Sequence, residues 1–178
     1  ARLAPGVRPV RAYEQLASRT GEYIQFRTDH HWTGLGAYHA YTAFAEAAGF
    51  SPLPLASLNL QTIPNFLGTL YQHTLAEELR ANPDTVEVYK IPNRTEAYHF
   101  PTGHTQGARA RLYADGVRGG GAYFVFLGSD YPLMRIVSDV RNGRRILVIK
   151  DSYGNPFVPY LAAHYEEVLV LDYRYFNG

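Results

Sequence analysis

The chain has 178 residues, of which 46% are hydrophobic and 19% charged, a composition that excludes a disordered chain and fits one folded domain. Its 17 Lys and Arg residues against 16 Asp and Glu give a formal net charge of +1, so charge offers no reason to expect nucleic acid as a partner. The chain has no cysteine, which excludes disulfides and cysteine nucleophiles, and no run of about 18 apolar residues predicts a membrane span.

The first part of the chain predicts helices that alternate with short strands. Residues 8–19 have the pattern of a short helix, residues 23–26 alternate like a strand, and Thr33 is a candidate N-cap for a helix over 33–48. The next expected elements are a strand at 58–63 that Pro64 breaks, a helix at 66–80, a turn at 82–84 and a strand at 86–89. Residues 92–120 predict loops or a hairpin, and a long excursion of this kind is often functional.

The last third of the chain predicts strands at 121–127 and 135–137, followed by a strand–helix–strand unit. Residues 145–149 form an almost continuous apolar run, which is typical of a central parallel strand covered on both faces. Asn155 fits the N-cap and Pro156 the first position of a helix that ends near residue 164, and an apolar strand follows at 167–171. These elements predict an α/β layered fold with a largely parallel sheet.

Ser152 comes three positions after a predicted buried strand and shortly before a predicted helix. In open parallel sheets, binding and catalytic sites form at the carboxyl ends of strands. A hydroxyl at such a turn also faces free backbone N–H groups, which can stabilise an oxyanion during acyl transfer. Two interpretations stay open: a serine nucleophile, and a plain turn or capping residue, which is the more common occupant of such a position.

Residues 28–32 read Thr-Asp-His-His-Trp and lie between a predicted strand and a predicted helix. In an extended backbone, Asp29 and His31 point to one side and His30 to the other. A carboxylate beside an imidazole orients the ring and fixes its tautomer, so Asp29 and His31 are a candidate orienter and base for Ser152. Two other interpretations stay open: metal ligation of zinc or iron by Asp29, His30 and His31, and a structural turn in which Asp29 caps the next helix.

Other polar residues carry weaker signals. The turn at 128–132 either lines a pocket or is a plain turn, which is the more common case. Arg174, just past the last strand, is a candidate to bind a carboxylate or to bridge the structure. The 15 tyrosines suit a sugar- or peptide-facing groove, or simply a tyrosine-rich core. We predict that Tyr153, Asn155, Asp130 and Arg174 bind the substrate.

Along most of its length the sequence resembles the DHHW protein family. The resemblance rests on five stretches: Arg27–Thr33 with the following Gly36–Tyr38, Gly68–Tyr71, Gly128–Pro132, Lys150–Tyr153 and Asp172–Phe176. Known relatives are longer and carry a membrane-anchoring N-terminal segment, which implies that these residues are the C-terminal portion of an extracytoplasmic bacterial protein. The resemblance implies a single SGNH-hydrolase-like domain over residues 1–178, with N-terminal elements of the fold outside it.

The pattern is also similar to the SGNH-hydrolase-like domains of alginate O-acetyltransferases of the AlgJ and AlgX type. Those enzymes carry an Asp-x-His-Trp motif ahead of a serine that an aromatic residue follows. Carried over position by position, this resemblance implies Asp29 as the acid of a catalytic triad, His31 as the base and Ser152 as the nucleophile. It also implies a three-layer α/β sandwich with a largely parallel central sheet, as in flavodoxin-like folds.

The chain departs from the SGNH pattern at two points. Lys150 stands where a glycine commonly opens the Gly-Asp-Ser block, and no clear Gly-x-Asn-Asp block supplies the usual oxyanion donors. Those donors would have to come from the Ser152 N–H, from neighbouring turn amides, or from a side chain such as that of Asn155.

We therefore expect a serine-dependent esterase or O-acetyltransferase, without a cofactor or metal, that acts on a cell-surface or secreted polysaccharide. One alternative is a non-catalytic surface module that binds glycan or protein, and another is a metal-dependent hydrolase that uses Asp29, His30 and His31. We expect no nucleic-acid partner and an extracytoplasmic location. Membrane anchoring is expected only through a segment outside this chain.

Overall fold

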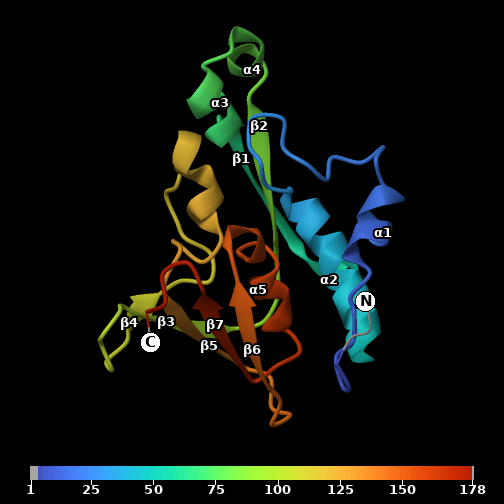
Figure 1. Ribbon diagram of the computed structural model, residues 1–178, viewed down its shortest axis with the longest axis vertical. Coiled ribbons are helices and arrows are strands. Elements are labelled where there is room, and N and C mark those ends of the chain that lie inside the picture. The colour runs from blue at the N-terminus through green and yellow to red at the C-terminus, as the bar shows by residue number, and fades with distance from the viewer. Residues whose placement is uncertain (1–3, 178) are drawn as a thin grey trace.

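Two β-sheets and several short helices make up a mixed α/β fold in a computed structural model, which describes residues 4–177 (Figure 1). The smaller sheet pairs β1 (Asn59–Phe66) antiparallel with β2 (Asp84–Lys90). The larger sheet has five strands in the order β4-β3-β5-β7-β6. Their bounds are Thr95–Phe100 for β3, Ala108–Ala110 for β4, Leu133–Ser138 for β5, Arg145–Lys150 for β6 and Glu167–Asp172 for β7.

The larger sheet is mostly antiparallel. Strand β3 runs antiparallel to β4 and β5, β5 runs antiparallel to β7, and β6 and β7 are the one parallel pair among the described strands. The expected three-layer, flavodoxin-like sandwich with a largely parallel sheet is therefore wrong. The predicted strand–helix–strand unit exists at β6 and β7, but the excursion at 92–120 folds as a hairpin, and a hairpin joins its strands antiparallel.

Strand β6 lies at the edge of the larger sheet, and no strand within residues 4–177 pairs with its outer side. Leu147 is 56% exposed and Ile149 is 65% exposed. The prediction of a strand covered on both faces is therefore wrong, because the apolar run gives the composition of the strand but not the number of its neighbours. The other half of the unit is more deeply buried, with Val168 and Val170 of β7 in the core.

Helix α2 (Gly34–Ala48) confirms the helix predicted at 33–48. The Thr33 side chain accepts a hydrogen bond from the Gly36 N–H at 3.1 Å and so caps the helix as predicted. A Cβ atom at Gly34 would lie 2.0 Å from the backbone oxygen of Glu87 in β2. Only glycine at this position lets the start of α2 approach the small sheet so closely.

The remaining helices are short. They are α1 (Ala12–Ala17), α3 (Thr69–Thr74), α4 (Glu77–Ala81), α5 (Val158–Leu161) and the 3₁₀ helices η1 (Leu55–Ser57), η2 (Gly119–Val125) and η3 (Ser152–Gly154). In Figure 1, α3 and α4 lie at the far end of the β1–β2 hairpin, while α1 and α2 lie side by side.

Several predicted elements differ from the structure. The helix expected at 66–80 is two helices, because Leu75 takes a left-handed conformation and ends α3. The strand expected at 121–127 is the 3₁₀ helix η2, and the strand at 23–26 is reduced to a single bridge between Gln25 and Trp32. Strand β1 continues past Pro64, with an irregularity in its register. Asn155 is not an N-cap: its backbone is already helical, and α5 begins later, at Val158.

Two apolar clusters form the core. One joins α2 and α5 to the larger sheet around Tyr41, Met134 and Val168. The other joins the small sheet to η2 around Phe66 and Val125. None of the helices within residues 4–177 has both the length and the apolar character needed to cross a bilayer.

Asp84, the first residue of β2, is a buried carboxylate that holds the segment before α2. Its oxygens accept hydrogen bonds from the Tyr23 hydroxyl at 2.6 Å, from the Arg27 N–H at 3.0 Å, and from the N–H and the hydroxyl of Thr28, both at 2.7 Å. Burial alone would raise the pKa of Asp84, but the hydrogen bonds from Tyr23 and Thr28 outweigh it and hold that pKa below its usual value.

Asp84→Asn is expected to lower the free energy of unfolding at pH 7 by about 3 kcal/mol. The NH₂ group of the asparagine would face buried N–H and O–H groups that are themselves hydrogen-bond donors and would lose their acceptor. Since the folded-state pKa of Asp84 is depressed, its contribution is present above the unfolded value of about 3.9 and is lost as the pH falls through the folded value. Urea unfolding at pH 7 and pH 3 measures both effects. Asp115→Asn, at an exposed ion pair with Arg111, is the control. Equal stability of wild type and Asp84→Asn at pH 7 would contradict this role.

Candidate active site

The loop between Phe26 and Thr33 brings Asp29 and His31 together through a turn. Its backbone bends continuously, and the His31 N–H donates to Asp29 Oδ1 at 2.9 Å, the short-range bond of an Asx turn. The extended backbone expected from the sequence is absent from this loop, yet the two side chains still meet. Both residues are buried, with 3% of Asp29 and 6% of His31 exposed.

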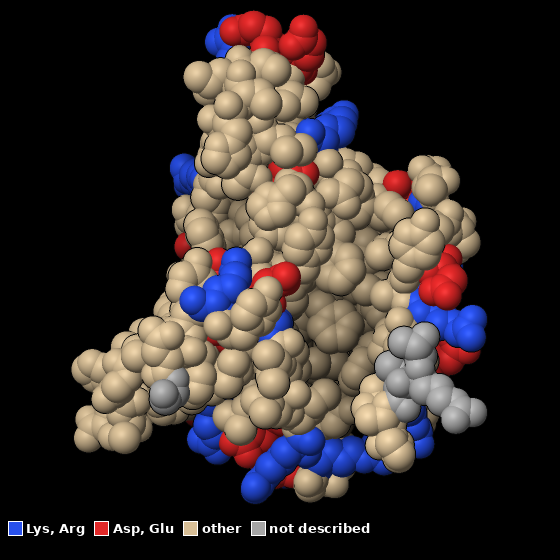
Figure 2. Space-filling view, viewed as in Figure 1, with Lys and Arg blue, Asp and Glu red and all other residues tan. Residues whose placement is uncertain are grey.

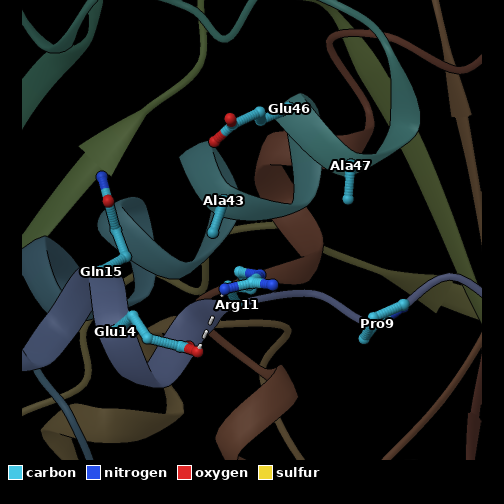
Figure 3. A pocket seen from close by; sticks show the side chains of 7 residues that line it. All are labelled: Pro9, Arg11, Glu14, Gln15, Ala43, Glu46 and Ala47. Atoms are coloured by element: carbon cyan, nitrogen blue, oxygen red, sulfur yellow. Dashed lines mark ion pairs between the residues drawn. The ribbon is translucent and has the colours of Figure 1, made fainter.

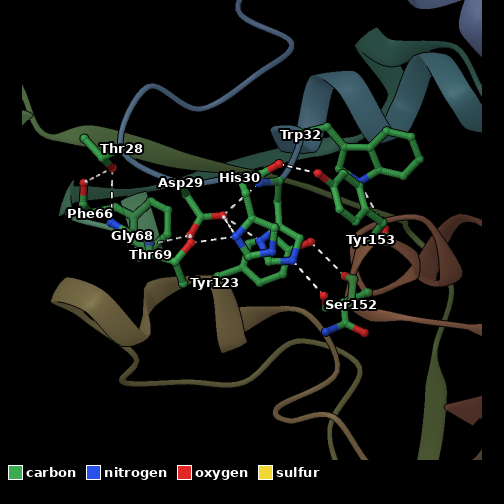
Figure 4. A network of polar contacts seen from close by, with 12 residues as sticks. Thr28, Asp29, His30, Trp32, Phe66, Gly68, Thr69, Tyr123, Ser152 and Tyr153 are labelled. Atoms are coloured by element: carbon green, nitrogen blue, oxygen red, sulfur yellow. Dashed lines mark hydrogen bonds and ion pairs between the residues drawn. The ribbon is translucent and has the colours of Figure 1, made fainter. Parts of the chain in front are cut away.

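Asp29, His31 and Ser152 form one hydrogen-bonded chain. Figure 4 labels Asp29 and Ser152, the two ends of this chain. His31 Nδ1 lies 2.5 Å from Asp29 Oδ1, and His31 Nε2 lies 2.8 Å from Ser152 Oγ. Ser152 opens the 3₁₀ helix η3 directly after β6 and Asp151, so the carboxyl end of β6 presents its hydroxyl to the loop. Residues 121 positions apart in the sequence therefore meet at hydrogen-bond distance.

The charge of Asp29 fixes the direction of these hydrogen bonds. Burial alone would raise the pKa of Asp29, but hydrogen bonds from the His31 side chain and from the N–H groups of Thr69 and His31 hold it well below its usual range. Because an ionised carboxylate only accepts, His31 Nδ1 carries the proton and donates to Asp29. With its proton on Nδ1, the His31 ring presents Nε2 to the Ser152 O–H as an acceptor, which is the arrangement that a general base requires.

Thr69 holds the second oxygen of Asp29. Its N–H and its hydroxyl donate to Asp29 Oδ2 at 2.8 and 3.1 Å. A Cβ atom at the preceding Gly68 would lie 2.3 Å from the Asp29 side chain, so glycine makes room for the carboxylate. The sequence analysis missed Thr69 as a site residue, although its stretch, Gly68–Tyr71, is one of those that carry the family resemblance.

Tyr123 of η2 is a second residue that the sequence analysis missed. Its ring stacks on His31 with the ring centroids 4.1 Å apart and the planes 16° apart, and its hydroxyl donates to the Ser152 backbone oxygen at 2.9 Å. Burial raises the pKa of Tyr123 well above its usual value, so the hydroxyl stays a donor. Tyr123 thus contacts both the imidazole and the serine turn.

Tyr153 and Trp32 tie the serine turn to the histidine loop. The Trp32 indole N–H donates to the Tyr153 backbone oxygen at 3.0 Å, and the Tyr153 hydroxyl donates to the His30 backbone oxygen. Tyr153 is 37% exposed and lies at the rim of the site, where we predicted a substrate contact. Its structural hydrogen bond means that the same side chain also holds the two loops in place.

A cluster of four charged side chains adjoins Ser152. Asp172 accepts from Lys150 Nζ at 2.7 Å, from Arg174 Nε at 2.9 Å and from Arg174 Nη2 at 2.6 Å. Arg174 Nη2 also lies 3.2 Å from Asp130, and Arg174 Nη1 lies 3.3 Å from Ser152 Oγ. Burial opposes ionisation of Asp172, but Arg174 and Lys150 prevail and lower its pKa to about 2. Arg174 therefore both bridges the structure and reaches the candidate nucleophile.

Asn155 lies beneath this cluster and has no exposed surface. Its amide nitrogen donates to Asp130 at 2.8 Å. A substrate cannot reach such a side chain, so the prediction that Asn155 binds substrate does not fit its position. Lys150, which stands where the SGNH pattern has a glycine, packs its stem against Gly154, where an added Cβ atom would lie 2.7 Å from it.

Asp29, His30 and His31 offer ligand atoms within 4.8 Å of one another, close enough for a metal ion. Most of these atoms are already used within the protein. Both oxygens of Asp29 accept hydrogen bonds from His31 and Thr69, and both ring nitrogens of His31 are engaged. His30 Nδ1 lies 2.6 Å from the Thr69 hydroxyl. A metal would have to displace this whole set of hydrogen bonds, so the donor set fits a metal poorly.

The cleft between α1 and α2 does not coincide with the candidate site. A cleft of about 470 Å³ lies between α1 and α2, lined by Pro9, Arg11, Glu14, Gln15, Ala43, Glu46 and Ala47 (Figure 3). Its Arg11–Glu14 ion pair is largely exposed, and none of its lining residues belongs to the hydrogen-bonded chain. A smaller apolar groove of about 260 Å³ adjoins the site, since Trp32, Lys150, Tyr153 and Gly154 line it together with residues of β6 and α2.

Comparisons with known proteins agree with the fold. A search of curated proteins found no match. The crystal structure of a DHHW family protein from Eubacterium siraeum is similar, with 36% identity and a TM-score of 0.88 over 95% of this chain and 57% of that chain. Bacillus cereus PatB1 is similar, with 23% identity and a TM-score of 0.78 over 99% of this chain and 64% of that chain.

A second PatB1 structure, with a sulfonyl adduct, has 21% identity and a TM-score of 0.76 over 99% of this chain and 62% of that chain. At these identities the likeness to PatB1 shows the fold alone. The chain spans less than two-thirds of the length of each of these solved chains. The model of the DHHW protein family matches residues 2–171. That match covers nearly the whole sequence, and the chain therefore belongs to the DHHW protein family.

Proposed function

We propose that the protein is a serine-dependent esterase or O-acetyltransferase that acts on an extracellular carbohydrate. The observation that carries the proposal is the contact of 2.8 Å between Ser152 Oγ and His31 Nε2, with Asp29 hydrogen-bonded to Nδ1 of the same ring. A nucleophile, a base within hydrogen-bond reach and a group that orients the base are the parts that nucleophilic acyl transfer needs.

The geometry supports the following reaction. Ser152 Oγ attacks the carbonyl carbon of an acetyl ester while its proton passes to His31 Nε2, and the carbonyl π pair moves onto oxygen. Collapse of this intermediate restores the carbonyl and breaks the bond to the leaving alcohol, which takes the proton from His31. Water or a sugar hydroxyl then attacks the acyl-serine in the same way: it gives its proton to His31, and collapse of the second intermediate releases Ser152, which takes that proton back. Asp29 stabilises the imidazolium form of His31 in both halves.

The sulfonyl adduct of PatB1 supports a nucleophile in this fold, since sulfonyl groups attach to nucleophilic side chains. The similarity of the Asp-x-His-Trp and Ser-Tyr motifs to alginate O-acetyltransferases of the AlgJ and AlgX type supports Ser152 as that nucleophile here. In this proposal the catalysis is of the SGNH kind, although the larger sheet is mostly antiparallel.

Exposed aromatic side chains support a carbohydrate substrate. Tyr153 is 37% exposed beside Ser152, and Tyr173 and Tyr175, which flank Arg174, are 61% and 46% exposed. Aromatic faces with a polar edge suit sugar rings. Figure 2 shows a face that is hollowed at its centre, with charged side chains gathered mainly around its edges. A cell-surface or secreted polysaccharide as substrate would put the protein outside the cytoplasm.

A sulfonyl fluoride is expected to modify Ser152 in the wild-type protein, because His31 activates its hydroxyl. Peptide mapping by mass spectrometry locates the adduct. Ser152→Ala should abolish both the adduct and p-nitrophenyl acetate hydrolysis, a loss of about 10³-fold or more. Ser57→Ala, in another 3₁₀ helix, is the matched control and should keep both. Unlabelled Ser152 together with unchanged hydrolysis by Ser152→Ala would reject the proposal.

Asp29→Asn is expected to lower kcat for acetyl-ester hydrolysis by about 10⁴-fold, because a neutral amide no longer fixes the Nδ1–H tautomer of His31. Steady-state kinetics on p-nitrophenyl acetate measure the effect. Asp139→Asn, which alters a hydrogen-bonded carboxylate that contacts none of the site residues, should leave kcat unchanged. A kcat within tenfold of wild type for Asp29→Asn would remove Asp29 from the mechanism.

Treatment with EDTA followed by desalting is expected to leave the hydrolysis rate within about twofold of the untreated rate, because Ser152, His31 and Asp29 supply the nucleophile, base and orienting group by themselves. Elemental analysis of the same samples is the parallel measurement. Loss of activity that added Zn²⁺ restores would instead support a metal-dependent hydrolase at Asp29, His30 and His31.

The competing view is a module that binds glycan without turnover. It predicts that wild type hydrolyses no acetyl ester, and that the double variant Asp29→Ala/Ser152→Ala binds glycan as well as wild type does. Isothermal titration with an acetylated oligosaccharide, run beside the ester assay, separates this module from the enzyme.

A further inference from the structure

We propose that Arg174 is a catalytic residue, whose Nη1–H forms the oxyanion site of Ser152 together with the Ser152 N–H. The inference rests on the serine chemistry proposed above and assigns to Arg174 a role other than recognition of a substrate carboxylate. Arg174 Nη1 lies 3.3 Å from Ser152 Oγ, which is the atom that would become bonded to the acyl carbon. An N–H at that distance can reach an oxygen that develops on the adjacent carbon.

Other candidate donors around Ser152 are already in use. The Tyr153 N–H donates to the Asp151 side chain at 2.9 Å, and the Gly154 N–H donates to the Asp151 backbone oxygen at 3.1 Å. The Asn155 amide is buried and donates to Asp130. The Ser152 N–H has no hydrogen bond within residues 4–177, and Arg174 Nη1 makes its one side-chain contact there with Ser152 Oγ. These two groups are the donors left for an oxyanion.

The guanidinium of Arg174 is held in a fixed orientation. Asp172 accepts from Nε at 2.9 Å and from Nη2 at 2.6 Å, and Asp130 lies 3.2 Å from Nη2. Lys150 Nζ donates to the same Asp172 carboxylate at 2.7 Å. With Nε and Nη2 bound, Nη1 is the end of the planar fork directed at Ser152. A donor fixed before the reaction needs no reorganisation when charge develops, which is what makes such a donor effective.

The balance of charge in the cluster argues against recognition of an anionic substrate. Two cations, Lys150 and Arg174, face two carboxylates, Asp172 and Asp130, so the cluster carries no excess positive charge. Asp172 raises the pKa of Arg174 further, so the guanidinium stays charged and donating at every pH at which the protein is folded. The cluster therefore provides one N–H group, that of Arg174 Nη1, directed at Ser152.

In the reaction, the Ser152 Oγ–carbon bond forms as the carbonyl π pair moves to oxygen, and the Arg174 N–H and the Ser152 N–H donate to that oxygen. Collapse returns the pair to the carbonyl and expels the alcohol, which His31 protonates. Because the oxygen carries a full charge only in the intermediate, Arg174 should lower the barrier more than it tightens ground-state binding. Its removal should therefore appear in kcat and leave KM almost unchanged.

The experiment measures hydrolysis of p-nitrophenyl acetate, a neutral ester with no carboxylate, by wild type, Arg174→Ala and Arg135→Ala. Arg135 forms an ion pair with Glu167 on β5 and β7, so its loss removes a comparable pair without contact to Ser152. We expect kcat to fall about 10²- to 10³-fold for Arg174→Ala, with KM within about twofold, and to stay near wild type for Arg135→Ala. Guanidinium ion at non-denaturing concentration should restore part of kcat in Arg174→Ala alone.

Any one of four outcomes would overturn the proposal. A kcat for Arg174→Ala within twofold of wild type overturns the oxyanion role and leaves the serine enzyme standing. A rise in KM with kcat kept also overturns it, in favour of substrate binding. A fall in kcat without guanidinium rescue overturns it in favour of a positioning role through Asp172. Absence of both hydrolysis and Ser152 labelling in wild type overturns the proposed function itself, and the oxyanion role with it.

Discussion

The carboxylate of Asp84 holds the loop on which the rest of the candidate site depends. It accepts hydrogen bonds from Tyr23, Arg27 and Thr28, so the two residues ahead of Asp29 are fixed to the start of β2. A buried carboxylate of this kind is stable only when donors surround it, and here every donor comes from the segment that leads into the loop. The small sheet thus gives the loop a rigid support, and Asp29 and His31 inherit their position from it.

The candidate site is assembled from four segments that are distant in the sequence. His31 comes from the loop before α2, Thr69 from α3, Tyr123 from η2 and Ser152 from the turn after β6. Tyr123 belongs to the apolar cluster of the small sheet, yet its hydroxyl bonds to the turn that follows the larger sheet. A residue of the small-sheet cluster and the turn that follows the larger sheet therefore both contact the His31 ring.

Together with the resemblance to alginate O-acetyltransferases, the sequence was sufficient to predict Asp29, His31 and Ser152 as a group. By themselves, their positions at turns before helices and their roles in acyl transfer made them candidates and left the turn and metal interpretations open. It was not sufficient for Thr69 and Tyr123, whose contacts with the site arise from packing across long separations. The prediction of a largely parallel sheet was wrong for a similar reason: an apolar run such as β6 shows that a strand forms but not which strands lie beside it. Asn155 was predicted to bind substrate, but its side chain is fully buried and donates to Asp130, a contact that its position after a strand does not reveal.

The outer edge of β6 carries a consequence for the behaviour of the chain in solution. Its backbone N–H and C=O groups have no partner strand within residues 4–177, and Leu147 and Ile149 stand beside them in contact with water. An uncovered, apolar edge is a template to which a strand of another molecule can add.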